Sequence, residues 1–360
     1  MFYKSHKNNS ETNKKKYLED IVILRLVLIF LLIWNHAFAP YSGKWNAIPN
    51  IEQIQTYKWL VLVVYHMRIQ ALIFISGYLL GYTSLRKNNA LSFKNCVIKK
   101  IKRLLIPSII FSILYYMIFY SINRPISYIA YTIVNGAGHL WFLPMLFWCF
   151  VGVYIMERFH IRPIYVLTIA LIAAMIPLPG LPLRIDQCFK YFIYFYIGFG
   201  LKRNYFKFLF PSKKIKPIIL CIIIYFTILI LNYIIISQQT YAISTLTNSS
   251  LIHRIIAALI NNLVSLIMSV SGLLAAFWST HYFIIGKYKL PEWMINLSTF
   301  CYGIYICHQF ILKYLYYNTK FPDLMGSILL PWVAIILTLL LSIIITYILL
   351  HTKIGRYLIG

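Results

Sequence analysis

An arginine and a histidine interrupt the first long apolar stretch of the chain, residues 21–40. Arg25 and His36 are eleven residues apart, so on a helix they share one face, roughly 20° apart around the axis and about 16 Å apart along it. Guanidinium binds anions and imidazole transfers protons near neutral pH. Because ionisable groups within a bilayer normally face a functional cavity, we predict such a cavity here. Two alternatives stay open: Arg25 could snorkel to the interface, and His36 could simply bond a carbonyl.

Histidines recur at a similar depth in three further apolar stretches. The polar and aromatic residues around them are His66, Arg68, Gln70, His139, Trp141, Tyr302, Tyr305, His308 and Gln309. Taken singly, His66 and His139 are more typical of a membrane interface than of catalysis. Their common depth nevertheless predicts a polar cavity shared by four helices. We expect His66, Arg68, His139 and Trp141 to bind the substrate there.

A basic run leads into the third apolar stretch and contains Lys99, Lys100, Lys102 and Arg103. Such a run is usually a cytoplasmic flank of a membrane helix. Clustered cations at a membrane surface can also hold phosphates, and we predict this role for Lys102 and Arg103 together with Arg25. The sequence contains no glycine-rich phosphate loop, so a nucleotide triphosphatase is disfavoured.

The composition indicates an all-α, polytopic membrane protein. Of the 360 residues 61% are hydrophobic, and the net charge of +26 is spread between apolar stretches. This distribution points to membrane lipids and an anionic cosubstrate as partners, and away from nucleic acid. Six cysteines show no disulfide or zinc spacing, so we expect no metal site. With only eight acidic residues, a buried carboxylate pair is nearly excluded.

We predict ten membrane spans with both termini in the cytoplasm. The expected spans are 21–40, 59–82, 104–122, 139–157, 163–178, 188–201, 217–237, 254–280, 295–317 and 328–350. Prolines limit the fifth and sixth, so nine or eleven crossings stay possible. The orientation follows from the loops, because 24 of the 34 Lys and Arg residues fall in the loops placed inside and five in those placed outside.

The membrane domain is expected to occupy residues 17–353. Residues 1–16, rich in Asn, Lys and Ser, are expected to form a disordered cytoplasmic tail, and residues 354–360 a short cytoplasmic one. The tripeptide Ala37-Phe38-Ala39 imitates a signal-peptide cleavage site. Arg25 within the apolar segment and Pro40 after the tripeptide favour a retained span.

Five short segments carry a resemblance to a known family. They are Arg25 and His36 with ten residues between them, residues 68–78 ending in Ser76-Gly77-Tyr78, the sequence K-R-L-L-I-P at 102–107, L-W-F-L at 140–143, and Y-G-I-Y-I-C-H at 302–308. In this order, over nearly the whole chain, they resemble the acyltransferase-3 family of integral membrane enzymes. Gln70 and Cys301 stand where many members have Pro and Ser, and both departures bear on acceptor choice.

The resemblance implies a sugar acyltransferase in the bacterial cell membrane, mostly one that O-acetylates surface glycans. The implied partners are a glycan or lipid-linked sugar acceptor and cytosolic acyl-CoA, acetyl-CoA above all. Acyl-CoA would be a cosubstrate, with no tightly bound cofactor. The expected class is therefore a multi-pass, acyl-CoA-dependent O-acyltransferase.

Thioester acyl transfer needs a base, oxyanion donors and cations for the donor diphosphate. We predict His36 as the base, with His308 as the rival, so that loss of the base lowers the rate by about 10²–10⁴-fold. Tyr305, Asn35 or Trp141 could supply the oxyanion donor. Catalysis would thus involve Arg25, His36, Tyr305 and His308.

Two other classes stay open. A transporter would use the same polar cavity as a substrate or proton path, although we see no inverted repeat between the halves. A partner in glycan export would use the polar residues only to hold helices together. Loss of His36 would then lower the protein level rather than turnover.

Overall fold

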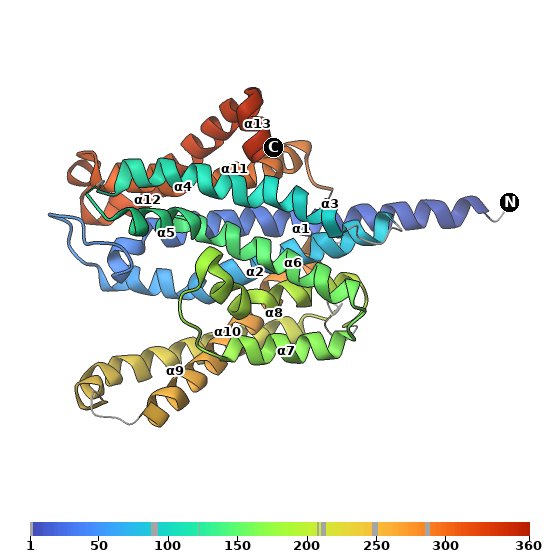
Figure 1. Cartoon of the computed structure of the whole chain (residues 1–360), viewed down its shortest axis with the longest axis horizontal. Coiled ribbons are helices and arrows are strands. Elements are labelled where there is room, and N and C mark those ends of the chain that lie inside the picture. Colours follow the sequence, from blue (N-terminus) through green and yellow to red (C-terminus); the bar gives the residue numbers. More distant parts are fainter. Residues whose placement is uncertain are drawn as a thin grey trace.

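The computed structural model describes residues 3–87, 93–121, 123–206, 209, 214–246, 251–284 and 289–360. Helices account for all the regular structure of these residues, with no strand among them (Figure 1). The α-helices are α1 (Tyr3–Ala37), α2 (Gln55–Lys87), α3 (Phe93–Lys100), α4 (Ile106–Phe119), α5 (Ile126–Val134), α6 (Phe142–Arg158), α7 (Pro163–Met175), α8 (Ile185–Lys202), α9 (Lys216–Leu246), α10 (Leu251–Ile284), α11 (Glu292–Tyr317), α12 (Phe321–His351) and α13 (Lys353–Ile359). Short turns of helix are η1 (Ala39–Ser42), η2 (Ile101–Leu105), η3 (Gly138–Trp141) and η4 (Pro182–Arg184).

Every one of the ten predicted spans coincides with a helix, so the all-α prediction is confirmed. Six helical segments of the described residues are long and apolar enough to cross a membrane. They are Glu19–Ala37, Gln55–Ser84, Lys94–Phe119, Gly138–Arg158, Ile255–Ile284 and Phe321–His351. The ten crossings and the cytoplasmic termini stay predictions.

Prolines set the ends of the short helices in the middle of the chain. Pro163 is the first residue of α7, where its missing N–H would have no helical partner in any case. The α7 helix ends at Met175, and Pro182 opens the turn that precedes α8. The prolines therefore make α7 one of the two shorter apolar helices of the described chain.

The first helix begins much earlier than we expected. Helix α1 runs from Tyr3 to Ala37 and so includes residues 3–16, which we assigned to a cytoplasmic tail; the disorder of that tail stays a prediction. Residues 3–20 contain no proline or glycine that would stop a helix propagating from the apolar segment. A helix that is already nucleated extends through polar residues of reasonable propensity.

Two glycines bring α2 and α8 into contact through their main chains. A side chain at Gly77 would collide with the carbonyl of Phe195, and one at Gly198 would collide with the carbonyl of Phe74. Small residues allow this close approach between membrane helices. Gly77 belongs to the Ser-Gly-Tyr segment singled out in the sequence, so that segment has a packing role.

Helix α1 lies within the helical assembly and packs against α2, α10, α11 and α12 (Figure 1). Its buried face is apolar, with Leu24, Leu28 and Ile33 almost fully enclosed. Helices α1 and α11 run side by side, and α11 also contacts η3. The polar residues predicted on α1 are therefore held against those on α11.

Candidate active site

The polar residues of α11 lie along one face of that helix. Cys301, Tyr302, Tyr305, His308 and Gln309 follow a spacing of three, four or seven residues, which places them in one stripe. On the neighbouring helix α1, Arg25 and His36 are three turns apart. Arg25 lies near Cys301, and His36 contacts Gln309. The two helices thus form a polar seam with an arginine at one end and a histidine at the other.

Three of the four predicted histidines meet at one end of this seam. The centre of the His308 ring lies 5.1 Å from that of His36 and 4.8 Å from that of His139. They come from α11, α1 and η3, so these three lie together, while their common depth in a membrane stays a prediction. We call them the histidine cluster.

His66, the fourth histidine, lies elsewhere. Its Nδ1 is 3.3 Å from the hydroxyl of Ser265 on α10. On α2 the residues that reach the cavity beside the cluster are Ile69 and Leu72. His66 is about 120° around the helix axis from Leu72. Residues predicted at the same depth therefore do not all face the same way. The position of His66 gives no support to the substrate-binding role predicted for it.

Gln309 connects the histidine cluster. Its carboxamide oxygen is 2.8 Å from the backbone nitrogen of His139, 2.7 Å from Nδ1 of the His139 ring and 3.1 Å from the Tyr115 hydroxyl. Its amide nitrogen is 3.2 Å from Nδ1 of His36. The side chain of Gln309 is buried, so these contacts replace water for all its polar atoms.

The turn η3 brings His139 to the cluster. It starts at Gly138, whose φ of +58° lies in the left-handed region. A Cβ at this position would stand 2.8 Å from the Gln309 carboxamide oxygen and would overlap the Tyr115 ring. Glycine is therefore required both for the backbone turn and for the approach of Gln309.

Tyr305 supports two of the three histidines. Its hydroxyl donates to the carbonyl of His139 at 2.6 Å, and its own carbonyl lies 2.6 Å from Nδ1 of His308. The Nε2 atom of His308 is buried and has no hydrogen-bond partner among the described residues. The Tyr305 hydroxyl donates its proton to the His139 carbonyl. In this arrangement that proton is therefore not available to an oxyanion.

Arg68 reaches the cluster through Asn35. One guanidinium nitrogen donates to the side-chain oxygen of Asn35, whose amide nitrogen donates to the Val61 carbonyl at 3.1 Å. The Nε and Nη1 atoms of Arg68 are buried without partners among the described residues. Asn35 is thereby fixed directly beside His36. One of its two amide N–H groups is used by the Val61 carbonyl, and its role as an oxyanion donor stays a prediction.

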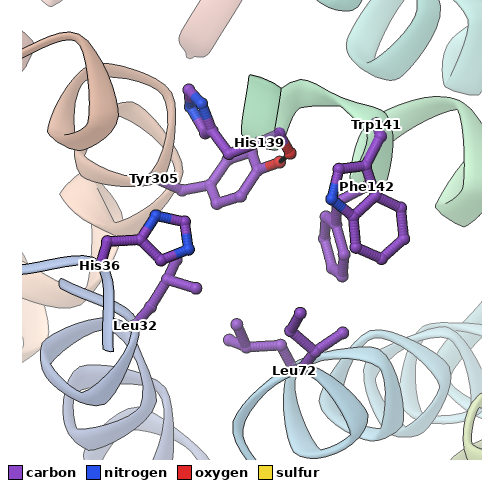
Figure 2. Close-up of a pocket in the computed structure, with 8 residues that line it drawn as sticks. Leu32, His36, Leu72, His139, Trp141, Phe142 and Tyr305 are labelled. Atoms are coloured by element: carbon purple, nitrogen blue, oxygen red, sulfur yellow. Dashed lines mark hydrogen bonds between the residues drawn. The ribbon is translucent and has the colours of Figure 1, made fainter. Parts of the chain in front are cut away.

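A small cavity lies beside the cluster. His36 and Tyr305 face Trp141 and Phe142 across it, and Leu32 and Leu72 close another side (Figure 2). Its volume is about 30 Å³, which leaves room for water but not for a sugar ring. Of the predicted substrate-binding residues, His139 and Trp141 line this cavity, and Trp141 is also one of the three oxyanion donors considered from the sequence.

Pro107 shapes the other end of the seam. The turn η2, immediately before α4, is a π-helix in which the N–H of Ile106 bonds the carbonyl of Ile101. Because Pro107 has no N–H, the carbonyl of Arg103 lacks its usual α-helical donor. The Tyr302 hydroxyl donates to that carbonyl at 2.7 Å and so ties η2 to α11. Insertions of this kind are frequent at functional sites.

The cations at this end are not neutralised by carboxylates. The ion pairs seen in the described part of the chain join Arg203 to Glu157 and His281 to Asp20. Lys102 and Arg103 are exposed on η2, and Arg25 interacts with the charge of Arg103. By contrast, the Lys100 ammonium lies 3.4 Å from the centre of the Phe150 ring. We call Arg25, Lys102 and Arg103 the cationic end of the seam.

A comparison with protein-family models identifies the chain. The model of the acyltransferase-3 family, described as an acyltransferase domain, matches residues 18–351. The chain belongs to the acyltransferase-3 family. No curated protein and no solved structure matches it. The resemblance inferred from five short segments is thus confirmed, and this acyltransferase-3 chain is a membrane acyltransferase by family and by its apolar helices.

Sequence reasoning missed the connecting role of Gln309 in this acyltransferase-3 chain and overlooked Tyr115 altogether. Gln309 was noticed only as a polar residue next to His308. Tyr115 lies in an apolar span of α4 and becomes relevant only because its hydroxyl meets Gln309. No local signal distinguishes such a tyrosine from the many others in the chain. Groups of three His, Cys, Asp or Glu placed to hold a metal ion do not occur within the described residues.

Proposed function

We propose that this acyltransferase-3 member transfers an acyl group, acetyl in the first instance, from cytosolic acyl-CoA to a sugar hydroxyl of a surface or lipid-linked glycan. The observation that carries the proposal is the polar seam between α1 and α11. It joins cations that have no carboxylate partner among the described residues to a histidine cluster with a cavity at the other end. Acyl transfer from coenzyme A requires both kinds of chemistry.

The cationic end is suited to the diphosphate of the donor. The Arg25 guanidinium can bind two phosphate oxygens at once, and the exposed Lys102 and Arg103 add positive charge at the approach. Arg25 and His36 are about 16 Å apart along α1, a span comparable to an extended pantetheine arm. A donor held by its phosphates could therefore present its thioester to the histidine cluster.

The histidine cluster is suited to the transfer itself. The sugar oxygen attacks the thioester carbon, the hydroxyl proton passes to an imidazole, and the tetrahedral oxyanion is stabilised by nearby N–H groups. The carbon–sulfur bond then breaks, and the same proton reaches the leaving sulfur. His36, the choice from sequence, and His308 are the two candidates for the base. The Trp141 indole is placed to donate to the oxyanion from the opposite wall.

The topology completes the proposal. With both termini in the cytoplasm, the cationic end faces the compartment where acyl-CoA is made, and the histidine cluster lies toward the outer side of the cell membrane. The acceptor then enters from outside or from the outer leaflet. Acyl-CoA is a cosubstrate in this scheme and no resident cofactor is needed.

The test compares surface glycans from cells with and without the protein by mass spectrometry, searching for a base-labile ester. In parallel, the purified protein in lipid nanodiscs is given acetyl-CoA and a glycan acceptor, and release of free coenzyme A thiol is followed. We expect ester formation and thiol release to depend on the protein and on the acceptor. Identical glycans in both strains, with acceptor movement that needs no acyl donor, would favour the transporter class.

A further inference from the structure

The orientation of the Gln309 carboxamide is fixed by an obligatory donor. A backbone N–H can only donate, and that of His139 lies 2.8 Å from the Gln309 side chain. The atom it meets must therefore be the carboxamide oxygen. The Tyr115 hydroxyl approaches the same oxygen at 3.1 Å. The amino group of Gln309 is consequently the atom that faces His36.

This orientation determines where His36 carries its proton. The Gln309 amino group can only donate, and it lies 3.2 Å from Nδ1 of His36. Nδ1 must then accept, so the neutral ring has its proton on Nε2. The free edge of the ring points toward the open centre of the cavity (Figure 2). His36 thus offers the cavity an N–H donor and no lone pair.

His308 is held in the opposite tautomer. Its Nδ1 lies 2.6 Å from the carbonyl of Tyr305, and a carbonyl can only accept. The proton of the neutral ring is therefore on Nδ1, and the lone pair is on Nε2. That atom is buried and unpartnered within the described part of the chain. Among the described residues, those that line the cavity include His36 but not His308, whose ring centre is 5.1 Å from that of His36. The acceptor hydroxyl can therefore reach Nε2 of His308 only when the cavity widens toward that ring.

We propose that Gln309 is a positioning residue that divides the work of the two histidines, with His308 Nε2 as the base and His36 Nε2–H as an oxyanion donor. The inference rests on the proposed acyl transfer and reverses the assignment made from sequence. The hydroxyl proton passes to His308, the oxyanion accepts a hydrogen bond from His36, and His308 returns the proton to the departing sulfur. His36 keeps its own proton throughout, so atoms and charges balance.

The substitution His36→Gln distinguishes an oxyanion donor from a base at this position. Its amide can donate a hydrogen bond, but it cannot accept a proton from a hydroxyl. We expect His36→Gln to retain at least about a tenth of kcat and His36→Ala to lose about 10²–10³-fold, the usual effect of losing one oxyanion donor. At position 308, both the Gln and the Ala variant should lose about 10²–10⁴-fold, as for a missing base. Equal losses in the two His36 variants, with activity retained in His308→Ala, overturn the assignment.

His351→Gln is the matched control. His351 lies near the end of α12, is exposed, and bonds the Tyr347 carbonyl through Nδ1 at 2.8 Å, in the manner of His308 and Tyr305. It has no contact with the cavity among the described residues. We expect its activity and amount in the membrane to equal those of the wild type. A loss in this variant would show that replacement of a histidine harms folding in general.

The tautomers can be measured without any turnover. In protein labelled with ¹⁵N-histidine, protonated and unprotonated ring nitrogens give separate NMR signals. We expect the proton of His36 on Nε2 and that of His308 on Nδ1. Gln309→Glu puts an acceptor against His36 Nδ1 and should move the His36 proton to that atom, with a kcat loss that does not add to that of His36→Ala. A proton on His36 Nδ1 in the wild type refutes the inference, whereas correct tautomers without acyl transfer refute only the proposed function.

Discussion

The two ends of the α1–α11 seam are built in different ways. At the histidine cluster, the polar groups are buried and connected to one another through Gln309 and Tyr305. At the cationic end, Lys102 and Arg103 are exposed and have no carboxylate partner in the described residues. A reaction centre gains from fixed geometry, whereas a binding site for a polyanion gains from positive charge. We therefore expect variants at the histidine cluster to lower kcat and most of those at the cationic end to raise KM.

The largest effect is expected from Arg25, at the cationic end. Arg25→Ala should lower kcat/KM for acyl-CoA by about 10²–10³-fold, because hydrogen bonds to a charged group are each worth about 1.5–3 kcal/mol. Arg25→Lys should recover little, since an ammonium cannot reproduce the two-pronged contact. Donor kinetics in nanodiscs measure both. Full activity of the Lys variant would remove the specific phosphate contact.

The next effect concerns Gly138. Gly138→Ala places a Cβ against the Gln309 oxygen and the Tyr115 ring, at a positive φ. Because displacement of a catalytic group by about 1 Å can lower the rate about 10²-fold, we expect a kcat loss of that order. The donor KM should stay unchanged. Gly43→Ala, also at positive φ but with open space around its Cβ, controls for backbone strain alone. Equal effects of the two substitutions would argue against a precise fit at Gly138.

A smaller effect is expected at the exposed cations. The double variant Lys102→Gln/Arg103→Gln should raise the donor KM about tenfold with kcat unchanged, which is the pattern for loss of uniform binding. The effect should shrink at high salt. Lys214→Gln/Lys216→Gln removes the same charge from another loop and should leave KM as in the wild type. Were both pairs to behave alike, the basic run would be an ordinary topological flank.

The smallest effect is expected at Tyr302. Tyr302→Phe removes the bond to the Arg103 carbonyl and leaves the ring in place. A hydrogen bond of this kind contributes about 1 kcal/mol, so the donor KM should rise about fivefold. Thr299→Val is the control, because its hydroxyl bonds only the Asn296 carbonyl of the same helix. A fall in kcat rather than a rise in KM would place Tyr302 with the histidine cluster and blur the contrast between the ends.

The fold was readable from the sequence because hydropathy dictates where helices form in a membrane protein. Each span predicted from a run of apolar residues coincides with a helix of the structure. The start of α1 was less accessible, because nothing in residues 3–16 shows where a helix that begins in the following segment would stop. The number of crossings is less accessible still, since charged residues in α8 and α11 lower their hydropathy without preventing a helix.

For the site, the sequence predicted only what helical periodicity determines, namely which residues share one face of a helix. The spacing of Arg25 and His36 and the stripe on α11 correctly placed residues on faces. Periodicity does not say which helix a face meets, so it could not show that His66 contacts Ser265 on α10. The positions of the protons on the histidine rings are still harder to predict from the sequence. They depend on a backbone N–H delivered by η3, more than a hundred residues away from Gln309 in the chain.

The cavity beside the histidine cluster, with a volume of about 30 Å³, has room for water but not for a sugar ring. A sugar ring cannot enter it unless a wall moves, and α2 is held to α8 by main-chain contact at Gly77 and Gly198. A water molecule needs no such movement. Whenever a thioester arrives before its acceptor, the nucleophile that fits is water, and the product is a free acid. The proportion of donor hydrolysed to donor transferred therefore reports how often the chain opens for a sugar, even before that sugar is known.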